Sequence, residues 1–306
     1  MSLLPACPSP VSQSERISVI DSLRGFAILG ILLMNMTGFA LPGVVGHDPS
    51  TLNEFGTINY YIWFFISWFV EGTQRALFSL LFGAGIILFV GRQENKLDGL
   101  LPADYFFRRQ LWLIVLSLFD VFILLWNGDI LLDYACLGMI MFAFRKLSPK
   151  TLLIASAICL LFMLARENRD FYQEKKMIAK GEAVAAIDTT QTKLTDNQKE
   201  ALESMTAFRE RSTQANKLKR MAKVNRKVQG NYASVYAYRT SQYIEDLVPY
   251  LYFELWDVLI FMFLGMAFFK LGFLTGTVSA KVYGWMTVWR IGARTYVILF
   301  QNAVHD

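Results

Sequence analysis

Charged residues are scarce in this sequence, and that scarcity excludes an ordinary water-soluble domain. Only 18% of the 306 residues are Asp, Glu, Lys or Arg, whereas 54% are hydrophobic and 15% are aromatic. A soluble chain of this length needs more charged surface than that. The apolar residues also come in blocks close to the thickness of a bilayer core, which indicates membrane-spanning helices.

Cysteine and histidine are nearly absent as well. Cys7, Cys136 and Cys159 form an odd set without C-x-x-C spacing, so the sequence predicts neither a disulfide framework nor a metal site. His47 and His305 are the only histidines, so few side chains are available as a general base near neutral pH.

The apolar blocks predict an all-α polytopic membrane helix bundle with about seven spans. The loop 40–56 contains no Lys or Arg, whereas the next loop is basic, so the first of these loops is expected outside and the second inside. The expected spans are 19–39, 66–90, 111–126, 130–144, 151–165, 247–269 and 282–300.

The block 57–90 is too long for one crossing, because a single helix of that length would measure roughly 50 Å. Glu71 and Arg75 interrupt it at i,i+4 spacing, where their side chains can pair. We therefore expect residues 59–65, which are rich in aromatic side chains, to lie along the outer interface before the span.

Charge divides the chain into four parts: a polar leader (1–18), an N-terminal membrane bundle of about five spans (19–165), a charged helical insert (166–246) and a C-terminal membrane part (247–306). The insert holds 16 Lys and Arg against 11 Asp and Glu, so it carries the entire net charge of +5. Thr195 to Gln198 predict a capping box. The number of crossings places the insert outside the membrane, since long loops translocate largely regardless of charge.

The run 209–227 has eight basic residues and one acidic residue. A solvated helix face is the favoured interpretation, and binding to anionic headgroups or to nucleic acid are the alternatives. No other feature of the sequence supports nucleic acid, and the oligomeric state stays open.

A set of ordered motifs resembles the YeiB family of bacterial inner-membrane proteins, a family of unknown function, over roughly residues 16–274. The first span begins D-S-L-R-G-F-A and continues to L-L-M-N, the second contains L-F-S-L-L-F-G-A-G, and the hairpin reads W-N-G-D-I-L followed by Y-A. The motif residues are Asp21, Arg24, Gly25, Asn35, Gly83, Gly85, Trp126, Gly128, Asp129 and Tyr134. Two departures are Val121, where relatives often have His, and residues 290–306, which differ from the family and suggest that the C-terminal part is incomplete.

The N-terminal pattern of that family is distantly similar to the transmembrane acyltransferase superfamily. The resemblance implies acyl transfer across the membrane, from a donor such as acyl-CoA to an extracytoplasmic glycan or lipid-linked acceptor. The expected location is the bacterial inner membrane, with the lipid bilayer as partner and no bound cofactor. The alternatives are a transporter or export partner, and a non-catalytic component of an envelope complex.

His47 and Asp129 are the candidate catalytic residues. His47 follows the first span on the outer side, where the superfamily places its base, and a neutral imidazole can take a proton from an acceptor. A solvated loop histidine is the alternative. Asp129 can orient a base or bind substrate, or it can cap the following helix.

Arg24, Arg108 and Arg109 are the candidate donor-binding residues, because guanidinium groups bind phosphate well. The alternatives are a structural pair between Asp21 and Arg24, and ordinary positive-inside anchoring by the other two arginines. Asn35 is expected to face the bundle interior, since an amide is costly in lipid. The glycine spacings 25…30 and 83…85 favour close helix packing rather than a nucleotide-binding loop.

Overall fold

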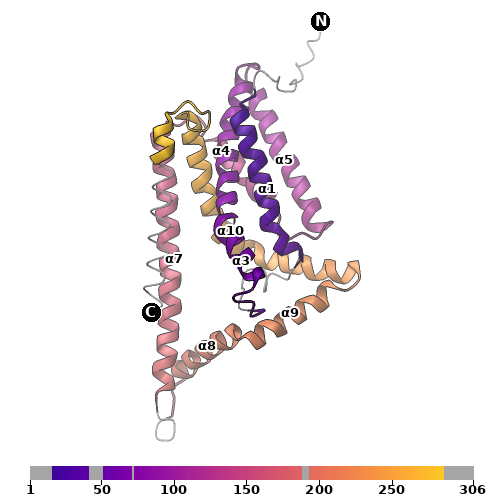
Figure 1. The fold of residues 1–306 in the computed structure, drawn as a ribbon, viewed down its shortest axis with the longest axis vertical. Coiled ribbons are helices and arrows are strands. Elements are labelled where there is room, and N and C mark those ends of the chain that lie inside the picture. The colour runs from indigo at the N-terminus through magenta and orange to yellow at the C-terminus, as the bar shows by residue number, and fades with distance from the viewer. Residues whose placement is uncertain (1–15, 41–50, 71, 188–192, 286–306) are drawn as a thin grey trace.

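The computed structural model describes residues 16–40, 51–70, 72–187 and 193–285, and no strand occurs within those ranges (Figure 1). This confirms the all-α prediction. The elements are α1 (Ser18–Ala40), α3 (Ile58–Phe65), the π-helical turn η2 (Ile66–Val70), α4 (Thr73–Glu94), α5 (Leu101–Phe122), α6 (Leu131–Phe142), α7 (Pro149–Ala185), α8 (Asp196–Ser212), α9 (Gln214–Val228) and α10 (Tyr232–Lys270).

Three helices of the described chain are long and apolar enough to cross a membrane, namely α1, α4 and α7. The expected count of about seven is not supported. The fourth expected span, α6, has 12 residues and measures roughly 18 Å, which is too short to span a bilayer core unaided. The seventh, 282–300, lies almost wholly outside the described residues.

The second span begins later than predicted. The helical path changes at the π-turn η2, and Gly72, with φ of 68°, separates it from α4. A left-handed backbone suits glycine and interrupts the helix there. The predicted pairing of Arg75 with Glu71 concerns a residue outside the described ranges. Within the described residues, Arg75 forms an ion pair with Asp257 of α10, at 3.4 Å.

The third expected span, 111–126, falls on α5, which begins ten residues earlier, ends four residues earlier and is not among the three helices suited to cross a membrane. Helix α5 begins at Leu101, with a proline in its first turn, and carries Arg108 and Arg109 inside the helix. Hydropathy detects where a helix is apolar, whereas the backbone stays helical through charged residues that also favour helix.

The centre of the bundle is the contact between α4 and α10. A Cβ added to Gly83 would lie 2.2 Å from the backbone oxygen of Met262, and one added to Gly265 would lie 1.9 Å from that of Leu80. The two helices therefore approach as closely as their backbones allow, as expected for Gly83. Buried residues of α4, α5, α6, α7 and α10 form the main apolar core around this contact.

The boundaries 166 and 246 of the expected insert fall inside continuous helices, because α7 has 37 residues and α10 has 39. Figure 1 shows α7 continuing beyond the bundle, and α8 and α9 leading back from its far end to the start of α10. The capping box predicted at Thr195 and Gln198 is present at the start of α8. The N-terminal part of α10 lies across the end of the bundle, and Pro249 lies inside this helix.

Large apolar side chains point outward on α1, α5 and α7. They include Phe26, Leu29, Trp112, Phe119, Ile158 and Leu161, each more than half exposed. So many exposed large apolar side chains on three helices are unusual for a soluble monomer and typical of helices in contact with lipid.

Candidate functional site

A cavity of about 290 Å³ lies between α1, α4, α5 and α6. Its lining is mostly apolar, but the guanidinium groups of Arg24 and Arg109 both reach it. Along α4 the lining runs from Phe78 to Ile86, which is roughly 12 Å of helix. The cavity therefore joins a cationic part to a longer apolar part, a combination that suits a ligand with an anionic head and a hydrocarbon tail.

The arginines are held at the cavity by their neighbours. A Cβ at Gly85 would lie 3.3 Å from the Nη2 atom of Arg24, so glycine leaves the room that this guanidinium occupies. Arg109 lies over the ring of Phe89, 5.2 Å from its centroid. The two guanidinium groups repel each other. An anion between them would relieve that repulsion.

A second, more open hollow of about 450 Å³ adjoins the first through Arg24, which lines both. Arg16, Asp21 and Arg92 also line it, so three of its charged groups are cations. Asp21 accepts a hydrogen bond from Arg24 at 3.4 Å, as the structural alternative expected. Arg24 thus connects a basic surface hollow to the interior cavity.

Sequence reasoning missed Gln110, a further polar residue of the cavity. Its side chain is only 1% exposed, and no atom of the described chain forms a hydrogen bond with its Oε1. Gly138 makes room for it, since a Cβ there would lie 2.9 Å from that oxygen. A buried amide oxygen without a partner is costly, and a donor group of a bound ligand would supply the missing hydrogen bond. No motif marks Gln110; only its position directly after Arg109 pointed towards it.

Tyr134 is placed by the fold rather than by its neighbours in sequence. Its hydroxyl lies 2.5 Å from the Oγ of Ser79 in α4, and Ser79 also donates to the backbone oxygen of Arg75. The rings of Phe78 and Phe82 meet Tyr134 edge-on, at 5.0 and 5.2 Å. Tyr134 therefore contributes to both the cavity wall and a buried polar contact.

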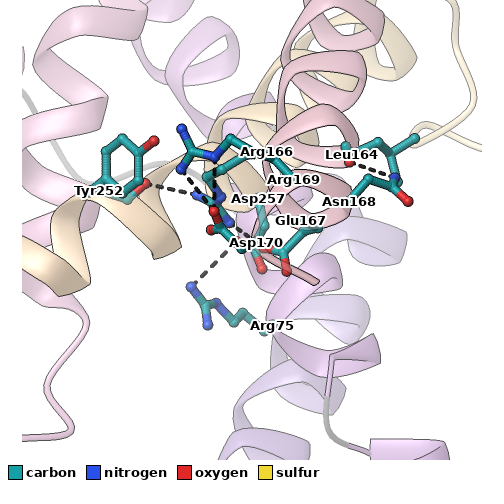
Figure 2. Close-up of polar contacts among 9 residues, drawn as sticks. All are labelled: Arg75, Leu164, Arg166, Glu167, Asn168, Arg169, Asp170, Tyr252 and Asp257. Carbon is teal, nitrogen blue, oxygen red and sulfur yellow. Dashed lines mark hydrogen bonds and ion pairs between the residues drawn. The ribbon is translucent and has the colours of Figure 1, made fainter. Parts of the chain in front are cut away.

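A charged layer lies where α7 and α10 leave the bundle (Figure 2). Arg166, with 4% of its side chain exposed, donates to the backbone oxygen of Tyr252 at 2.9 Å and pairs with Glu167. The Arg75–Asp257 pair lies close by, joining α4 to α10. These contacts join α4 and α7 to α10, and none of Arg75, Arg166 and Asp257 lines the cavity, so the cavity is the better candidate for a ligand site.

Asp129 lies in the turn between α5 and α6 and does not line the cavity. Its Oδ1 accepts from the backbone N–H of Leu131 at 3.2 Å, and Ser117 donates to its Oδ2. The first contact satisfies a backbone N–H in the first turn of α6, but from one residue before the N-cap, which is Ile130 and not Asp129. The carboxylate of Asp129 also acts on Tyr243 of α10, which precedes the expected sixth span. Burial raises the pKa of the Tyr243 hydroxyl, and the negative charges of Asp133 and Asp129 raise it further.

The rest of the hairpin motif is structural. Trp126 packs on Phe39 of α1, with ring centroids 4.6 Å apart. A Cβ at Gly128 would lie 2.8 Å from the indole of Trp126, so a side chain there would displace the ring. Asn127 donates to the backbone oxygen of Arg239 at 3.1 Å, which ties this turn to α10.

The remaining predicted residues lie elsewhere. Arg108 pairs with Asp104 on the exposed face of α5, at 2.9 Å, so the structure separates it from Arg24 and Arg109. His47 lies outside the described residues. Asn35 is half-buried in α1. Gly25 has open space around it, contrary to the close packing expected, whereas Gly30 packs against the buried Gln74.

Over its described residues, the chain is all-helical, with three helices suited to a membrane and a cationic cavity between helices. Over about half its length the chain is similar to uncharacterized bacterial proteins. It is 36% identical to YxaH of Bacillus subtilis (strain 168) over 160 residues, 51% of this chain and 39% of that protein. It is 33% identical to YeiB of Escherichia coli (strain K12) over 135 residues, 44% of this chain and 32% of that protein.

A third relative, a 39.9 kDa uncharacterized protein encoded beside an amylase gene of Bacillus acidopullulyticus, is 33% identical over 154 residues, 50% of this chain and 41% of that protein. The chain therefore spans about a third to two fifths of the length of these relatives. No family model matches the chain, and no solved structure matches it.

Proposed function

We propose that this chain is a multi-pass protein of the bacterial inner membrane, of the YeiB type, that binds an acyl donor in the cavity and transfers its acyl group to an extracytoplasmic glycan or lipid-linked acceptor. The observation that carries the proposal is the cavity lined by Arg24 and Arg109 and extended by apolar side chains. A phosphate-bearing acyl thioester such as acyl-CoA matches this pairing of a cationic part with an apolar part. Its phosphate would lie near the arginines and its acyl chain against the apolar wall. The open hollow around Arg16 and Arg92 offers further cations to the nucleotide part.

In the proposed reaction the acceptor hydroxyl attacks the thioester carbonyl. A C–O bond forms and the C–S bond breaks, while a base takes the hydroxyl proton and the departing thiolate gains a proton. His47, predicted on the outer side, is the proposed base. If so, His47→Ala lowers turnover by about two to four orders of magnitude while leaving donor affinity unchanged.

Donor binding is tested on the purified full chain in detergent, with a long-chain acyl-CoA, free CoA and the free fatty acid as probes. Arg24→Ala and Arg109→Ala should each weaken acyl-CoA binding by about tenfold or more, because each removes a charge-assisted contact. Arg108→Ala is the matched control, since it removes the same charge from an exposed part of α5 that does not line the cavity. Equal affinity in all three variants would reject the cavity as the donor site.

The proposed topology is tested with single cysteines in a background without Cys7, Cys136 and Cys159. An impermeant maleimide should label Ser50→Cys and Thr213→Cys in intact cells, and should spare Asn95→Cys. Labelling of Asn95→Cys alone would reverse the orientation.

Transport or export of an anion is the second candidate function. It is favoured by the polar contacts beside the cavity, above all the Arg75–Asp257 pair and the Ser79–Tyr134 contact. Asp129→Asn keeps the capping geometry and removes the charge. A graded loss of uptake across Asp129→Asn, Arg75→Gln and Tyr134→Phe, with full activity in His47→Ala, would favour transport over acyl transfer.

A further inference from the structure

Helix α9 carries most of its cations on one side and its half-buried apolar residues on the other, with Lys217 as the cation on the apolar side. At 100° per residue, Lys219, Arg220, Lys223 and Arg226 fall within an arc of roughly 120°. All four are exposed. Met221, Val224 and Val228 fall on the opposite side and are half-buried. The apolar side of α9 is thus partly covered by the rest of the protein, and the cationic side is exposed.

These four cations, called here the α9 basic face, lack anionic partners among the described residues. Helix α9 contains no Asp or Glu, and none of the four forms a hydrogen bond or an ion pair there. Arg209 in the preceding helix is different, because it pairs with Glu182 at 2.6 Å. Four neighbouring cations without a counter-charge repel one another, and an external anionic surface would offset that repulsion.

The place of α9 in the fold indicates which anionic surface this is. At the start of α10, Tyr232 donates to the backbone oxygen of Ile123, directly after α5, at 2.9 Å. Tyr232 and Tyr236 are 59% and 40% exposed. Figure 1 shows α9 leading into this part of α10, which lies across the end of the bundle where the apolar helices stop. Exposed tyrosines beside a basic amphipathic helix are typical of the boundary between a membrane and water.

We propose that the α9 basic face binds the anionic phospholipid headgroups of the outer leaflet and holds the segment from α8 to α10 against the membrane. The inference rests on the proposed membrane location and on charge complementarity, and it is independent of the acyl donor and of the cavity. The binding is electrostatic, so it weakens as salt is added.

The test uses the full chain in lipid nanodiscs made either of phosphatidylcholine alone or of phosphatidylcholine with phosphatidylglycerol. Hydrogen–deuterium exchange of residues 214–228 should be several-fold slower in the anionic nanodiscs, and the difference should disappear at high salt. Replacing the four cations by glutamine (K219Q, R220Q, K223Q and R226Q) should remove the difference. The matched control replaces four other exposed lysines of the insert by glutamine, namely Lys175, Lys176, Lys180 and Lys193, and should retain it.

Equal exchange of α9 in the two lipid mixtures would overturn the proposal while leaving the membrane location intact. Slower exchange caused by a soluble oligonucleotide, but not by anionic lipid, would overturn it in favour of nucleic acid. Failure of the protein to enter either nanodisc would reject the membrane location, and with it this inference.

Discussion

The contact between α4 and α10 and the contact between α7 and α8 both rely on glycine, yet they are built differently. In the first, Gly83 and Gly265 face backbone oxygens of the partner helix, and a large apolar core surrounds them. In the second, Gly181 faces mainly the side chain of Met205, which is the one buried residue of α8 among those described. Burial therefore fixes the bundle, whereas caps and ion pairs contribute more to the segment formed by α8 and α9. A substitution of similar size should cost more in the bundle.

The largest effect is expected from Gly83→Ala. The new methyl group would collide with the backbone of Met262, which no rotamer change can relieve, so we expect a loss of about 3 kcal/mol in the free energy of unfolding, the upper end of the usual cost of overpacking. Thermal unfolding of the purified protein measures it. Gly91→Ala, in the same helix but with open space around it, is the control and should stabilise by about 1 kcal/mol. Similar melting temperatures for the two variants would contradict the close α4–α10 contact.

An intermediate effect is expected from Ser79→Ala. It leaves the buried Tyr134 hydroxyl without its side-chain partner, which should cost about 1–3 kcal/mol. The double variant Ser79→Ala with Tyr134→Phe removes both polar groups and should recover much of that loss. Thermal unfolding of the two single variants and the double variant measures these losses. Fully additive losses would mean that the two hydroxyls do not interact.

The smallest effect is expected from Thr195→Ala, which removes the capping box of α8. The loss should be about 1 kcal/mol and local to α8. Hydrogen exchange should accelerate in residues 196–212 while the global melting temperature stays unchanged. A large drop in melting temperature would show that the segment is as strongly coupled to the core as α10 is, and would remove the contrast between the two regions.

The local features of the chain could be predicted from its sequence. Helix α1, the capping box at Thr195 and the small-residue contact at Gly83 all follow from short-range patterns. Hydropathy was less successful for the span count and the helix ends, since it detects apolar residues rather than continuous backbone. The pairing of Arg75 with Asp257, 182 positions later in the chain, lay beyond any local pattern.

The candidate site likewise combines residues that the sequence pointed to with features that only the structure showed. Residue type alone marked Arg24, Arg108 and Arg109 as phosphate binders, but a shift of one residue along a helix turns a side chain by about 100° and so changes the face it occupies. Arg109 reaches the cavity and Arg108 pairs with Asp104 outside it. Gln110 had no distinguishing mark, because its importance comes from burial without a partner, which depends on α6 packing against α5.

The sequence by itself determined that the chain is helical, strongly apolar and basic in one segment, because composition and periodicity fix helix type and charge residue by residue. Only the tertiary structure decided that α7 and α10 continue through the boundaries of that segment, that Tyr134 meets Ser79, and that two arginines share one cavity. The physical reason is that a hydrogen bond or a cavity wall depends on which helix faces come together. That choice is made by packing between residues far apart in the chain.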